Sequence, residues 1–444
     1  MKIIIAGAGE VGIYLAKLLS QENQDIVFMD SDEEKLNIPY GLEIMTAVGN
    51  PTSINDLKAA GVKRADMFIA VTPEESVNMT ASMLATNLGA QKTIARVSNT
   101  EYLLPKNMEF FSKLGIDSII CPEILAADEI VNALKTPWSR QWSELAGGKL
   151  ILVGAKIRDN APVINKYLYD ISQGEKIYHI VAIKRENDTI IPRGSDRILS
   201  GDIVYFTTTP KHVPDIKTLA GKDHININRI TIMGGSRIAM KVCENLSNSI
   251  NIKLIEKDRE KSYRLAEKMP GNVMVINGDG RNTDLLVREN IKGCDAFIAL
   301  TANSEANILA CVTAKSLGVP KTVAEVENED YIQMAEKLDI GTVINKKLIT
   351  ASHIYQFLLN ADVSTVKSMT FADAEVAELV ARPKSKITRK LVKELNLPQD
   401  MTLGGKIRGG VVDIIEGDTR IEAGDHVVVF CLNSAMRKIE DYFN

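Results

Sequence analysis

The sequence predicts an α/β protein in which one unit, a doubly wound parallel sheet followed by a small α+β module, occurs twice. Three observations lead to this prediction. The chain repeats itself, short apolar runs alternate with helical patterns, and each alternating stretch is followed by a segment of different rhythm. The 444 residues suffice for two to four domains at about 150 residues per domain.

The repeat is visible in two places. Residues 3–12, IIIAGAGEVG, correspond to residues 230–239, ITIMGGSRIA; each is an apolar run, a glycine-rich turn and the start of a helical pattern. Residues 49–99 align with residues 278–328 without a gap, and 18 of these 51 positions are identical. Chance would give only a few identities, so the chain is expected to contain a tandem duplication.

The first part of each unit alternates strands with helices. Strands are expected at residues 2–6, 26–30, 43–47, 66–71, 92–97 and 117–120, and helices near residues 11–21, 53–60, 76–88, 101–114 and 123–135. Because these strands are apolar on both faces and are separated by helices, they predict a parallel sheet that is covered on both sides.

The second part of each unit is expected to be a small α+β module. In the first half we expect strands at 149–153, 180–184, 189–192 and 202–206, a short helix near 162–173, and a hairpin turn at 185–188. In the second half we expect strands at 374–381, from 406, at 411–415 and at 425–430, with a helix near 386–395. The predicted domains are 1–140, 141–225, 226–365 and 366–444, with linkers near 138–148, 221–228 and 361–370.

The composition narrows the class of protein. Hydrophobic residues make up 45%, charged residues 25% and aromatic residues 5%, which is ordinary for a soluble globular protein with aliphatic cores. A net charge of -4 argues against nucleic acid as a main partner, because such binders present a strongly basic face. The apolar runs are broken well before about 18 residues, so no transmembrane helix is expected. The short run at residues 1–7 is also interrupted too soon, by Glu10, for a signal peptide.

The cysteines and histidines predict no metal site. Five cysteines are scattered singly without C-x-x-C spacing, which fits a reducing compartment and neither a disulfide framework nor a zinc site. The histidines stand alone and are expected to be structural or to lie on the surface; they are His179, His212, His224, His353 and His426.

The first glycine loop, Gly7-Ala8-Gly9-Glu10-Val11-Gly12, follows a strand and opens a helix, as a dinucleotide-binding loop does. Gly7 permits the tight turn, Gly9 lets the backbone approach a pyrophosphate, and Gly12 allows close helix–strand packing. Asp30 ends the second strand, where a carboxylate can bond ribose hydroxyls and would repel the 2′-phosphate of NADP. We therefore expect a Rossmann-like site for NAD(H) or an adenine nucleotide. The alternative is a turn that needs its glycines only for packing.

The second loop, Gly234-Gly235-Ser236-Arg237-Ile238, departs from this pattern. Ser236 replaces Gly9 and narrows the approach to a phosphate, whereas Arg237 replaces Glu10 and can grip phosphate oxygens. Glu256 keeps the ribose-binding carboxylate. We expect NAD(H) to bind at the first site and ADP or ATP to bind at the second. Two alternatives stay open: the second site binds nothing, or Arg237 points into solvent or pairs with Glu256 or Glu244.

Other candidates lie at the carboxyl ends of the expected strands, where ligands bind in open α/β sheets. A plain turn or a solvated surface side chain explains each of them almost as well. These candidates are Gly49, Asn50, Thr72 and Arg96 in the first half, and Gly278, Asp279 and Thr301 in the second. Glu325 stands opposite Arg96 in the alignment, so the two sites differ in charge here too.

No catalytic constellation accompanies the glycine loops. The sequence contains no H-E-x-x-H, no G-x-S-x-G and no G-x-x-x-x-G-K-[ST], and the small modules offer no persuasive acid–base pair. Cofactor binding without a catalytic partner favours a sensor over an enzyme.

These features occur together and doubled in one chain: the first glycine loop with Asp30, the strand ends Gly49-Asn50 and Ala70-Val71-Thr72, and the module that ends in Gly201-Asp202-Ile203-Val204-Tyr205-Phe206. In the order large–small–large–small, they resemble the TrkA family, the cytosolic regulatory subunits of Trk potassium-uptake systems. The resemblance covers essentially the whole chain and implies two tandem Rossmann-like RCK (or KTN) N-domains, each followed by a small α+β RCK C-terminal domain.

The resemblance also implies a partner and a mechanism. A bound nucleotide changes the hinge between domains, and the oligomer, a homotetramer, pulls or pushes on an integral-membrane potassium-transporting subunit of the TrkH or TrkG kind. The protein would then be cytoplasmic and peripheral at the inner face of the membrane. In this family the helix after the sixth strand pairs the sheet domains, which implies residues 124–134 and 348–359 here; packing on the chain's own sheet is the alternative. Two other functions stay open: an NAD-dependent oxidoreductase, and a nucleotide sensor for another potassium channel or without a membrane partner.

Overall fold

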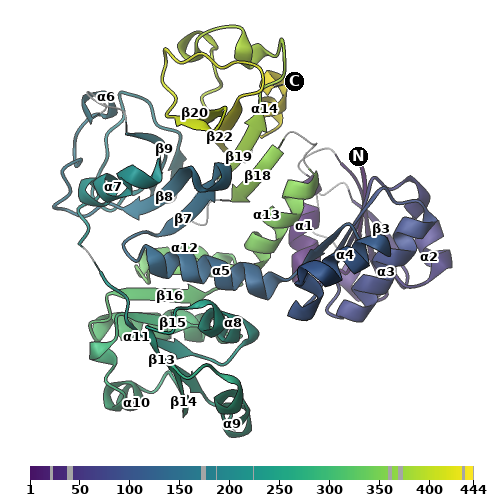
Figure 1. Ribbon diagram of the computed structural model, residues 1–444, viewed down its shortest axis with the longest axis horizontal. Coiled ribbons are helices and arrows are strands. Elements are labelled where there is room, and N and C mark those ends of the chain that lie inside the picture. Colours follow the sequence, from purple (N-terminus) through teal and green to yellow (C-terminus); the bar gives the residue numbers. More distant parts are fainter. Residues whose placement is uncertain are drawn as a thin grey trace. The chain divides into compact units, whose positions relative to one another are not determined.

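The computed structural model describes residues 1–20, 24–37, 44–171, 177–186, 188–223, 225–358, 363–368, 374–432 and 436–443 (Figure 1). Contacts divide the chain into two compact units. The first unit holds Met1–Leu125 and Lys346–Leu359, and the second holds Ala126–Asn345 and Asn360–Asn444. Each unit is therefore built from non-contiguous parts of the chain.

The first unit contains a parallel sheet with the order β3-β2-β1-β4-β5-β6. Its strands are β1 (Lys2–Ala6), β2 (Asp25–Asp30), β3 (Met45–Val48), β4 (Met67–Ala70), β5 (Lys92–Arg96) and β6 (Ser118–Ile120). The helices that follow them are α1 (Glu10–Ser20), α2 (Ile54–Ala59), α3 (Glu75–Leu88), α4 (Pro105–Lys113) and α5 (Pro122–Lys135). The strand order reverses between β1 and β4, which places a topological switch point at the end of β1.

The core of this sheet is aliphatic. Ile3, Ile4 and Ile5 are completely buried although successive side chains of a strand point to opposite faces. Both faces are therefore covered, and the covered faces explain why the strands read as continuous apolar runs.

The second unit contains a matching parallel sheet with the order β14-β13-β12-β15-β16-β17. Its strands are β12 (Arg229–Met233), β13 (Asn251–Glu256), β14 (Val273–Asn277), β15 (Ala296–Ala299), β16 (Lys321–Glu325) and β17 (Thr342–Ile344). The helices are α8 (Arg237–Asn245), α9 (Arg259–Lys268), α10 (Thr283–Arg288), α11 (Ser304–Ser316), α12 (Asp330–Lys337) and α13 (Lys346–Leu358).

Two small antiparallel sheets complete the second unit, with the orders β10-β9-β11-β8-β7 and β18-β19-β22-β20-β21. The first consists of β7 (Gln141–Leu145), β8 (Leu150–Lys156), β9 (Tyr178–Arg185), β10 (Asp188–Ile190) and β11 (Ile203–Thr208), with α6 (Leu168–Ile171) and α7 (Val213–Leu219). The second consists of β18 (Val363–Ser368), β19 (Ala374–Val380), β20 (Met401–Arg408), β21 (Val411–Asp413) and β22 (His426–Leu432), with α14 (Met436–Phe443).

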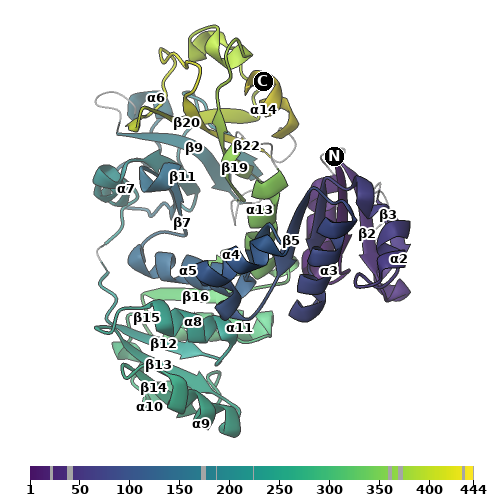
Figure 2. The same ribbon diagram turned by 45° about the vertical axis from the view of Figure 1, so that its right-hand side comes forward.

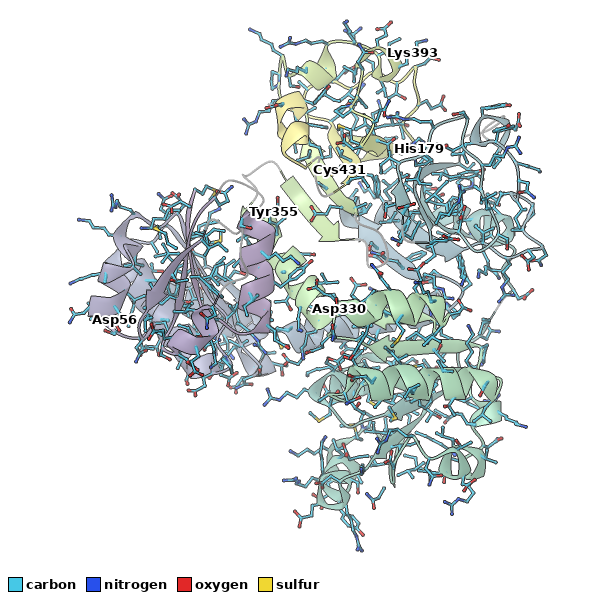
Figure 3. All side chains as sticks on the ribbon, turned by 180° about the vertical axis from the view of Figure 1, so that it is seen from behind. Asp56, His179, Asp330, Tyr355, Lys393 and Cys431 are labelled. Carbon is cyan, nitrogen blue, oxygen red and sulfur yellow. The ribbon has the colours of Figure 1, made fainter. Side chains whose placement is uncertain are left out.

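The two small sheets pack against each other (Figure 2). The hydroxyl of Thr207 donates to the carbonyl of Gly404 at 3.0 Å, and the backbone N–H of Ala146 donates to Glu378 at 3.0 Å. His179, labelled in Figure 3, lies 3.3 Å from the hydroxyl of Thr402. The two modules therefore form one layered body within the second unit.

The helix that follows each large sheet leaves that sheet. α13 follows β17 of the second unit, yet it packs on α1 in the first unit, where Tyr355 is almost fully buried (Figure 3). From Ala126 onward α5 belongs to the second unit, where Asp128 accepts a hydrogen bond from Asn245 of α8 at 3.1 Å. The structure therefore places α13 on a helix of the first unit of the same chain, and the pairing of sheet domains that the resemblance implies for it stays a prediction. Residue 359, the last of the range implied for this helix, lies outside the described residues.

The predicted α/β class and the duplicated order of sheets are confirmed. Asp188 pairs with Arg185, and Glu186 between them has a φ of +50°, as the predicted hairpin requires, although residue 187 lies outside the described residues. The described part of the predicted linker at 221–228 is irregular; residue 224, with its histidine, also lies outside. The bounds of the four predicted domains stay a prediction.

Four local predictions are wrong. The predicted linker at 138–148 contains β7, whose polar residues hide the alternation that buries Ser143 and Leu145. The helix near 162–173 is reduced to α6, because Asn165 takes a φ of +60°; residues 172 and 173 are not described. The helix near 386–395 is two 3-10 turns, Lys386–Thr388 and Val392–Glu394. Pro105 splits the helix expected at 101–114 into a 3-10 turn, Thr100–Leu103, and α4.

Three further elements were not expected. β18 lies within the predicted linker at 361–370, whose residues 361, 362, 369 and 370 are not described. The helices α7 and α14 each follow the last strand of a small sheet. Both are shorter than nine residues, so they offer little periodicity for a sequence to reveal.

Replacing Asp202 with alanine should lower the free energy of unfolding of the first small module by about 2–3 kcal/mol, because a buried ion pair is broken. Arg185 grips Asp202 with two hydrogen bonds of 3.0 and 2.8 Å, and Asp202 is only 2% exposed. Urea denaturation followed by tryptophan fluorescence measures the effect, because Trp138 and Trp142 pack on this core. Asp188→Ala, at an exposed position of the same sheet, is the control, and an equal effect of both variants would contradict the prediction.

Candidate functional site

The first glycine loop lies against the end of β4. Gly7 has a φ of +115°, and a Cβ there would stand 2.7 Å from the backbone nitrogen of Thr72. A Cβ on Gly12 would stand 2.0 Å from the carbonyl oxygen of Gly7. Neither position has room for a side chain. Gly9 differs, since no atom lies within 4 Å of the place its Cβ would take, so the backbone there is open to a ligand.

Asp30 holds this loop in place. Its Oδ2 accepts the backbone N–H of Ala8 at 2.7 Å, and its Oδ1 accepts that of Asp32 at 3.0 Å. The side chain is almost buried, and each carboxylate oxygen keeps a second lone pair for a hydroxyl group. Asp30 therefore shapes the loop in addition to the ribose-binding role that the sequence predicts. The side chains of Ala8 and Val11 are buried in the protein core beneath the loop.

A buried asparagine fixes the ends of β4 and β5. The Asn78 side chain accepts hydrogen bonds from the backbone N–H of Thr72 at 2.9 Å and from its hydroxyl at 2.7 Å. The amide group of Asn78 donates to the carbonyls of Thr72 at 2.9 Å and Arg96 at 2.8 Å. These hydrogen bonds of Asn78, which we call the clamp, hold Thr72 beside Gly7. The clamp contacts the backbone of Arg96 and not its side chain.

Gly49 and Asn50 form a turn after β3. The N–H of Gly49 donates to the carbonyl of Asp30 at 2.9 Å, which extends the ladder by one residue. The Asn50 side chain accepts the N–H of Thr52 at 2.9 Å, and Asp56 accepts the N–H of Asn50 at 2.9 Å. Gly49 is therefore at the sheet edge, and Asn50 has a structural role in the turn.

Glu10 does not stand alone in the first turn of α1. Its carboxylate lies 3.1 Å from the Nζ of Lys347 on α13, and the Lys347 side chain is only 13% exposed. The lysine offsets the negative charge that would face a phosphate. Glu10 therefore gives less reason than the sequence suggests for the first site to reject a highly charged phosphate.

The second glycine loop has the same turn but a different helix start. Gly234 has a φ of +96°, and a Cβ there would stand 2.9 Å from the carbonyl oxygen of Leu300. The side chain of Ser236 caps α8 by accepting the N–H of Ala239 at 3.2 Å. One donor that a phosphate could use is thus already occupied by the protein itself. Ile238 is buried in the core.

Glu256 occupies the place of Asp30, with one more partner. Its Oε2 accepts the N–H of Gly235 at 3.0 Å and lies 2.7 Å from Lys261, and its Oε1 accepts the N–H of Asp258 at 2.9 Å. Burial raises the pKa of Glu256, but Lys261 and the two N–H groups outweigh burial and hold the pKa below its usual range. Lys261 also neutralises the carboxylate that a ribose would meet.

Arg237 is exposed at the start of α8. Within the described part of the chain it forms no ion pair, because the two acids considered as partners are paired elsewhere. Glu244 lies 2.6 Å from Lys241, and Glu256 pairs with Lys261. Pairing with either acid, one of the alternatives that the sequence left open, is wrong, and the guanidinium faces solvent.

The remaining candidates of the second half repeat the first half in part. Thr301 is held by Asn307 as Thr72 is by Asn78, with a hydroxyl bond of 2.6 Å and a backbone bond of 3.1 Å. Gly278 continues the ladder through a 2.9 Å bond to the carbonyl of Glu256. A hydrogen bond from Arg281 holds the pKa of Asp279 well below its usual range, and Lys257 lies 3.6 Å away.

Sequence reasoning missed the residues that hold the site together. Asn78 and Asn307 are identical at matching positions of the gapless alignment, which is a signal that could have found them. Lys347 and Lys261 carried no such signal, because neither lies in a motif. The structure brings the first loop, Asp30, Thr72 and Lys347 to one place; it does not bring the side chain of Arg96 into a contact with them.

The described residues carry no group of three or more His, Cys, Asp or Glu side chains placed to hold a metal ion. All five cysteines are buried, and none of them forms a disulfide within the described part of the chain. Among the described helices, none is both long enough and apolar enough to cross a bilayer.

Comparison with known families gives a match over most of the chain. The model of the TrkA-N domain matches residues 3–122 and 230–346, and that of the TrkA-C domain matches residues 152–221 and 376–444. The Trk system potassium uptake protein TrkA of Halomonas elongata is 32% identical over 448 residues, covering 99% of this chain and 97% of its own. TrkA homolog 1 of Methanosarcina mazei is 30% identical over 452 residues and covers both chains fully.

Solved structures agree in fold. The GsuK RCK domain covers 100% of this chain and 94% of its own with a TM-score of 0.61 at 14% identity. The GsuK channel bound to NAD covers 100% of this chain and 78% of its own with a TM-score of 0.61 at 15% identity. GsuK bound to ADP covers 81% and 69% with a TM-score of 0.52 at 14% identity.

Replacing Asn78 with alanine should lower the free energy of unfolding by about 2–4 kcal/mol, since buried partners at two strand ends lose their hydrogen bonds. Asn307→Ala should act alike. Urea denaturation followed by circular dichroism checks both. Asn87→Ala is a matched control on α3, because Asn87 is exposed and makes one hydrogen bond to its own helix. A loss of stability no larger than in this control would contradict the stabilising role of the Asn78 and Asn307 hydrogen bonds.

Proposed function

We propose that this chain, which belongs to the TrkA family, is a cytosolic regulatory subunit that binds NAD(H) or adenine nucleotides and thereby gates a Trk-type potassium-uptake transporter. The four domains proposed from the sequence would be its working parts: the Rossmann-like domains 1–140 and 226–365 and the small domains 141–225 and 366–444. Membership of the family supports the transporter partner, and the folds of RCK structures support assembly as a homo-oligomer, proposed to be a tetramer.

One observation supports nucleotide binding above the others: Gly7 and Gly12 have no room for a side chain, whereas no atom lies within 4 Å of the place that a Cβ on Gly9 would take. At the start of a helix the free N–H groups and the helix dipole attract a pyrophosphate. Asp30 and Thr72 would then face the ribose and the nicotinamide side of an NAD(H) molecule.

The second site is proposed to prefer ADP or ATP. Its serine cap and the Glu256–Lys261 pair weaken the features that favour a dinucleotide, whereas the unpaired guanidinium of Arg237 favours a terminal phosphate. The preference of the first site for NAD(H) rests on the open Gly9 and on Asp30, because Lys347 neutralises Glu10.

Lys347 also suggests how nucleotide binding in the first half could affect the second half. Its helix, α13, follows the last strand of the second large sheet and begins beside the first glycine loop. A phosphate at the loop would compete with Glu10 for this lysine, so binding would change the contact between α1 and α13. A ligand can shift a hinge only through such differential contacts.

An NAD-dependent oxidoreductase is the second candidate, favoured only by the dinucleotide-type loop. A dehydrogenase needs a proton acceptor beside the hydride acceptor, and the sequence offers no persuasive pair. Absorbance at the NADH band during incubation with common alcohols and hydroxy acids separates the two: steady NADH production would overturn the regulatory proposal. Purification of the chain from its cells tests the partner. Co-purification with a potassium transporter supports the proposal, whereas co-purification with a channel, or with no membrane protein, contradicts it.

Replacing Gly9 with alanine should weaken NAD(H) binding by about tenfold or more, because the new methyl group occupies the approach of the pyrophosphate. Stability should not change, since the methyl meets no protein atom within 4 Å. Calorimetric titration of the full chain with NAD, NADH, ADP and ATP measures this.

Gly271→Ala is the matched control, because Gly271 also has open space and no positive φ. Equal affinity of Gly9→Ala and the control, or no nucleotide binding by the natural chain, would contradict the assignment of the first site.

Replacing Arg237 with alanine should weaken ATP binding by about tenfold and leave NAD(H) binding unchanged, because a charge-assisted bond to phosphate is lost. The measurement is the same titration in the Gly9→Ala background, in which binding at the first site is expected to be weaker by about tenfold or more. Arg288→Ala, at an exposed position on α10, is the control. Equal losses for ATP and NAD(H) would rule out a phosphate-selective role.

A further inference from the structure

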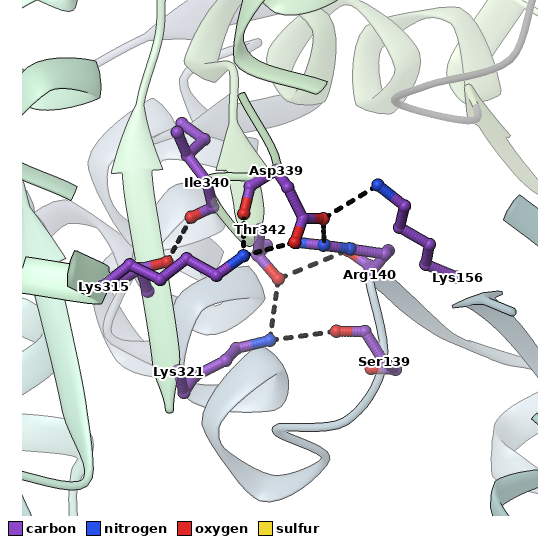
Figure 4. Close-up of polar contacts among 9 residues, drawn as sticks. Ser139, Arg140, Lys156, Lys315, Lys321, Asp339, Ile340 and Thr342 are labelled. Atoms are coloured by element: carbon purple, nitrogen blue, oxygen red, sulfur yellow. Dashed lines mark hydrogen bonds and ion pairs between the residues drawn. The ribbon is translucent and has the colours of Figure 1, made fainter. Parts of the chain in front are cut away.

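A cavity of about 200 Å³ in the second unit is lined by an unusual number of cations (Figure 4). They come from the segment before β7, from β8, from the end of the first small module, and from α11 and β16. The cations are Arg140, Lys156, Arg158, Lys222, Lys315 and Lys321. None of the glycine-loop residues lines this cavity, so it is separate from the nucleotide sites proposed above.

The carboxylates in the lining of the cavity are too few to neutralise these six cations. Asp339 alone accepts from Arg140 and Lys315 and lies 3.0 Å from Lys156 (Figure 4). Asp223 lies 3.1 Å from Arg158 at the exposed rim. Glu336, outside the lining, also acts on Arg140 and Lys156.

Among the described residues, two lysines of the cavity form no ion pair with a carboxylate. The Lys321 side chain is buried, and its Nζ donates to the carbonyl of Ser139 at 2.9 Å and the hydroxyl of Thr342 at 2.8 Å, both uncharged (Figure 4). Among the described residues, the ammonium of Lys222 has neither a hydrogen bond nor an ion pair. Burial together with the nearby arginines lowers the pKa of Lys222 to about 7. Burial also lowers the pKa of Lys321 well below its usual range.

The first half has no such cluster, although its framework is the same. Lys92 matches Lys321 but is exposed, and Thr86 matches Lys315. Gly115, with a φ of +90°, takes the turn where the second half has Asp339 with a φ of +53°. The second half therefore holds an aspartate in a backbone conformation that glycine adopts more easily, and strained residues of this kind cluster at binding sites.

We propose that this cavity binds a phosphate-type oxyanion, as inorganic phosphate, as pyrophosphate, or as the phosphoryl group of a larger metabolite. Its volume holds several water molecules, enough for a phosphate or a diphosphate. Arg140 and Arg158 supply donors in a fixed fork, and Lys222 and Lys321 supply the charge that no carboxylate claims. A bound dianion would keep both lysines protonated.

Sulfate is the decisive probe, because it stays doubly charged from pH 6 to 9 while Lys222 loses its proton. The charged groups that act on Lys222 are Arg140, Arg158, Lys156 and Asp339, and Lys321 is coupled to it across the cavity, where burial lowers the pKa of Lys321 as well. Calorimetry on the full chain should show saturable binding of one sulfate, about tenfold weaker at pH 8.5 than at pH 6 because one charge-assisted bond is lost. Absence of saturable binding of sulfate, phosphate and pyrophosphate alike would overturn the proposal.

Variants tie the binding to the cavity. Lys222→Met should weaken sulfate binding about tenfold at pH 6 and reduce its pH dependence. Lys211→Met, at an exposed position before α7, should change neither. Lys315→Thr, which introduces the residue of the first half, is a second variant that should also weaken binding. Unchanged affinity in both cavity variants would overturn the proposal. Tighter binding of pyrophosphate than of phosphate identifies a diphosphate as the source of the group and supports the proposal.

Discussion

The close approach of the β1–α1 turn to the end of β4 is the constraint on which the first unit depends. Gly7 can meet Thr72 only because it has no side chain and takes a left-handed backbone. That approach puts the start of α1 at the switch point of the sheet, where the strand order reverses between β1 and β4. Asn78 holds β4 and β5 in position from the other side. The open space at Gly9 exists only because its neighbours are fixed in this way.

The two halves keep this framework and change the charges placed on it. The turns at Gly7 and Gly234, and the clamps of Asn78 and Asn307, agree almost atom for atom. In contrast, Glu10 corresponds to Arg237 and Arg96 to Glu325, and Lys261 adds an ion pair at Glu256 that Asp30 lacks. The two halves thus share the backbone geometry of the loop, while side chains at its rim differ. This difference is the basis for proposing different ligands for the two halves.

Much of this could be predicted from the sequence, because it depends on local patterns. Buried parallel strands appear as apolar runs, and the glycine loop and its acid have fixed spacing, so the sheets, the loop and Asp30 were all within reach. β7 and the 3-10 turns after residue 385 were not, because polar residues obscure their periodicity. Lys347 could not be predicted, since only the tertiary fold brings residue 347 to residue 10. The cluster at Asp339 has the same cause: its cations lie up to 199 positions away in sequence.

The departure of α13 from its own sheet has a consequence for how such a chain can arise. A protein with one sheet and one such helix would have to lend that helix to a second molecule, because its own α1 could be covered only by another copy. Fusing two copies end to end turns this exchange between molecules into one within a single chain. In this chain the first unit includes α13 from the second half, and the second unit includes α5 from Ala126 onward. The fusion also frees the two halves from symmetry, which is what allows one to carry Glu10 and the other Arg237 at the same turn.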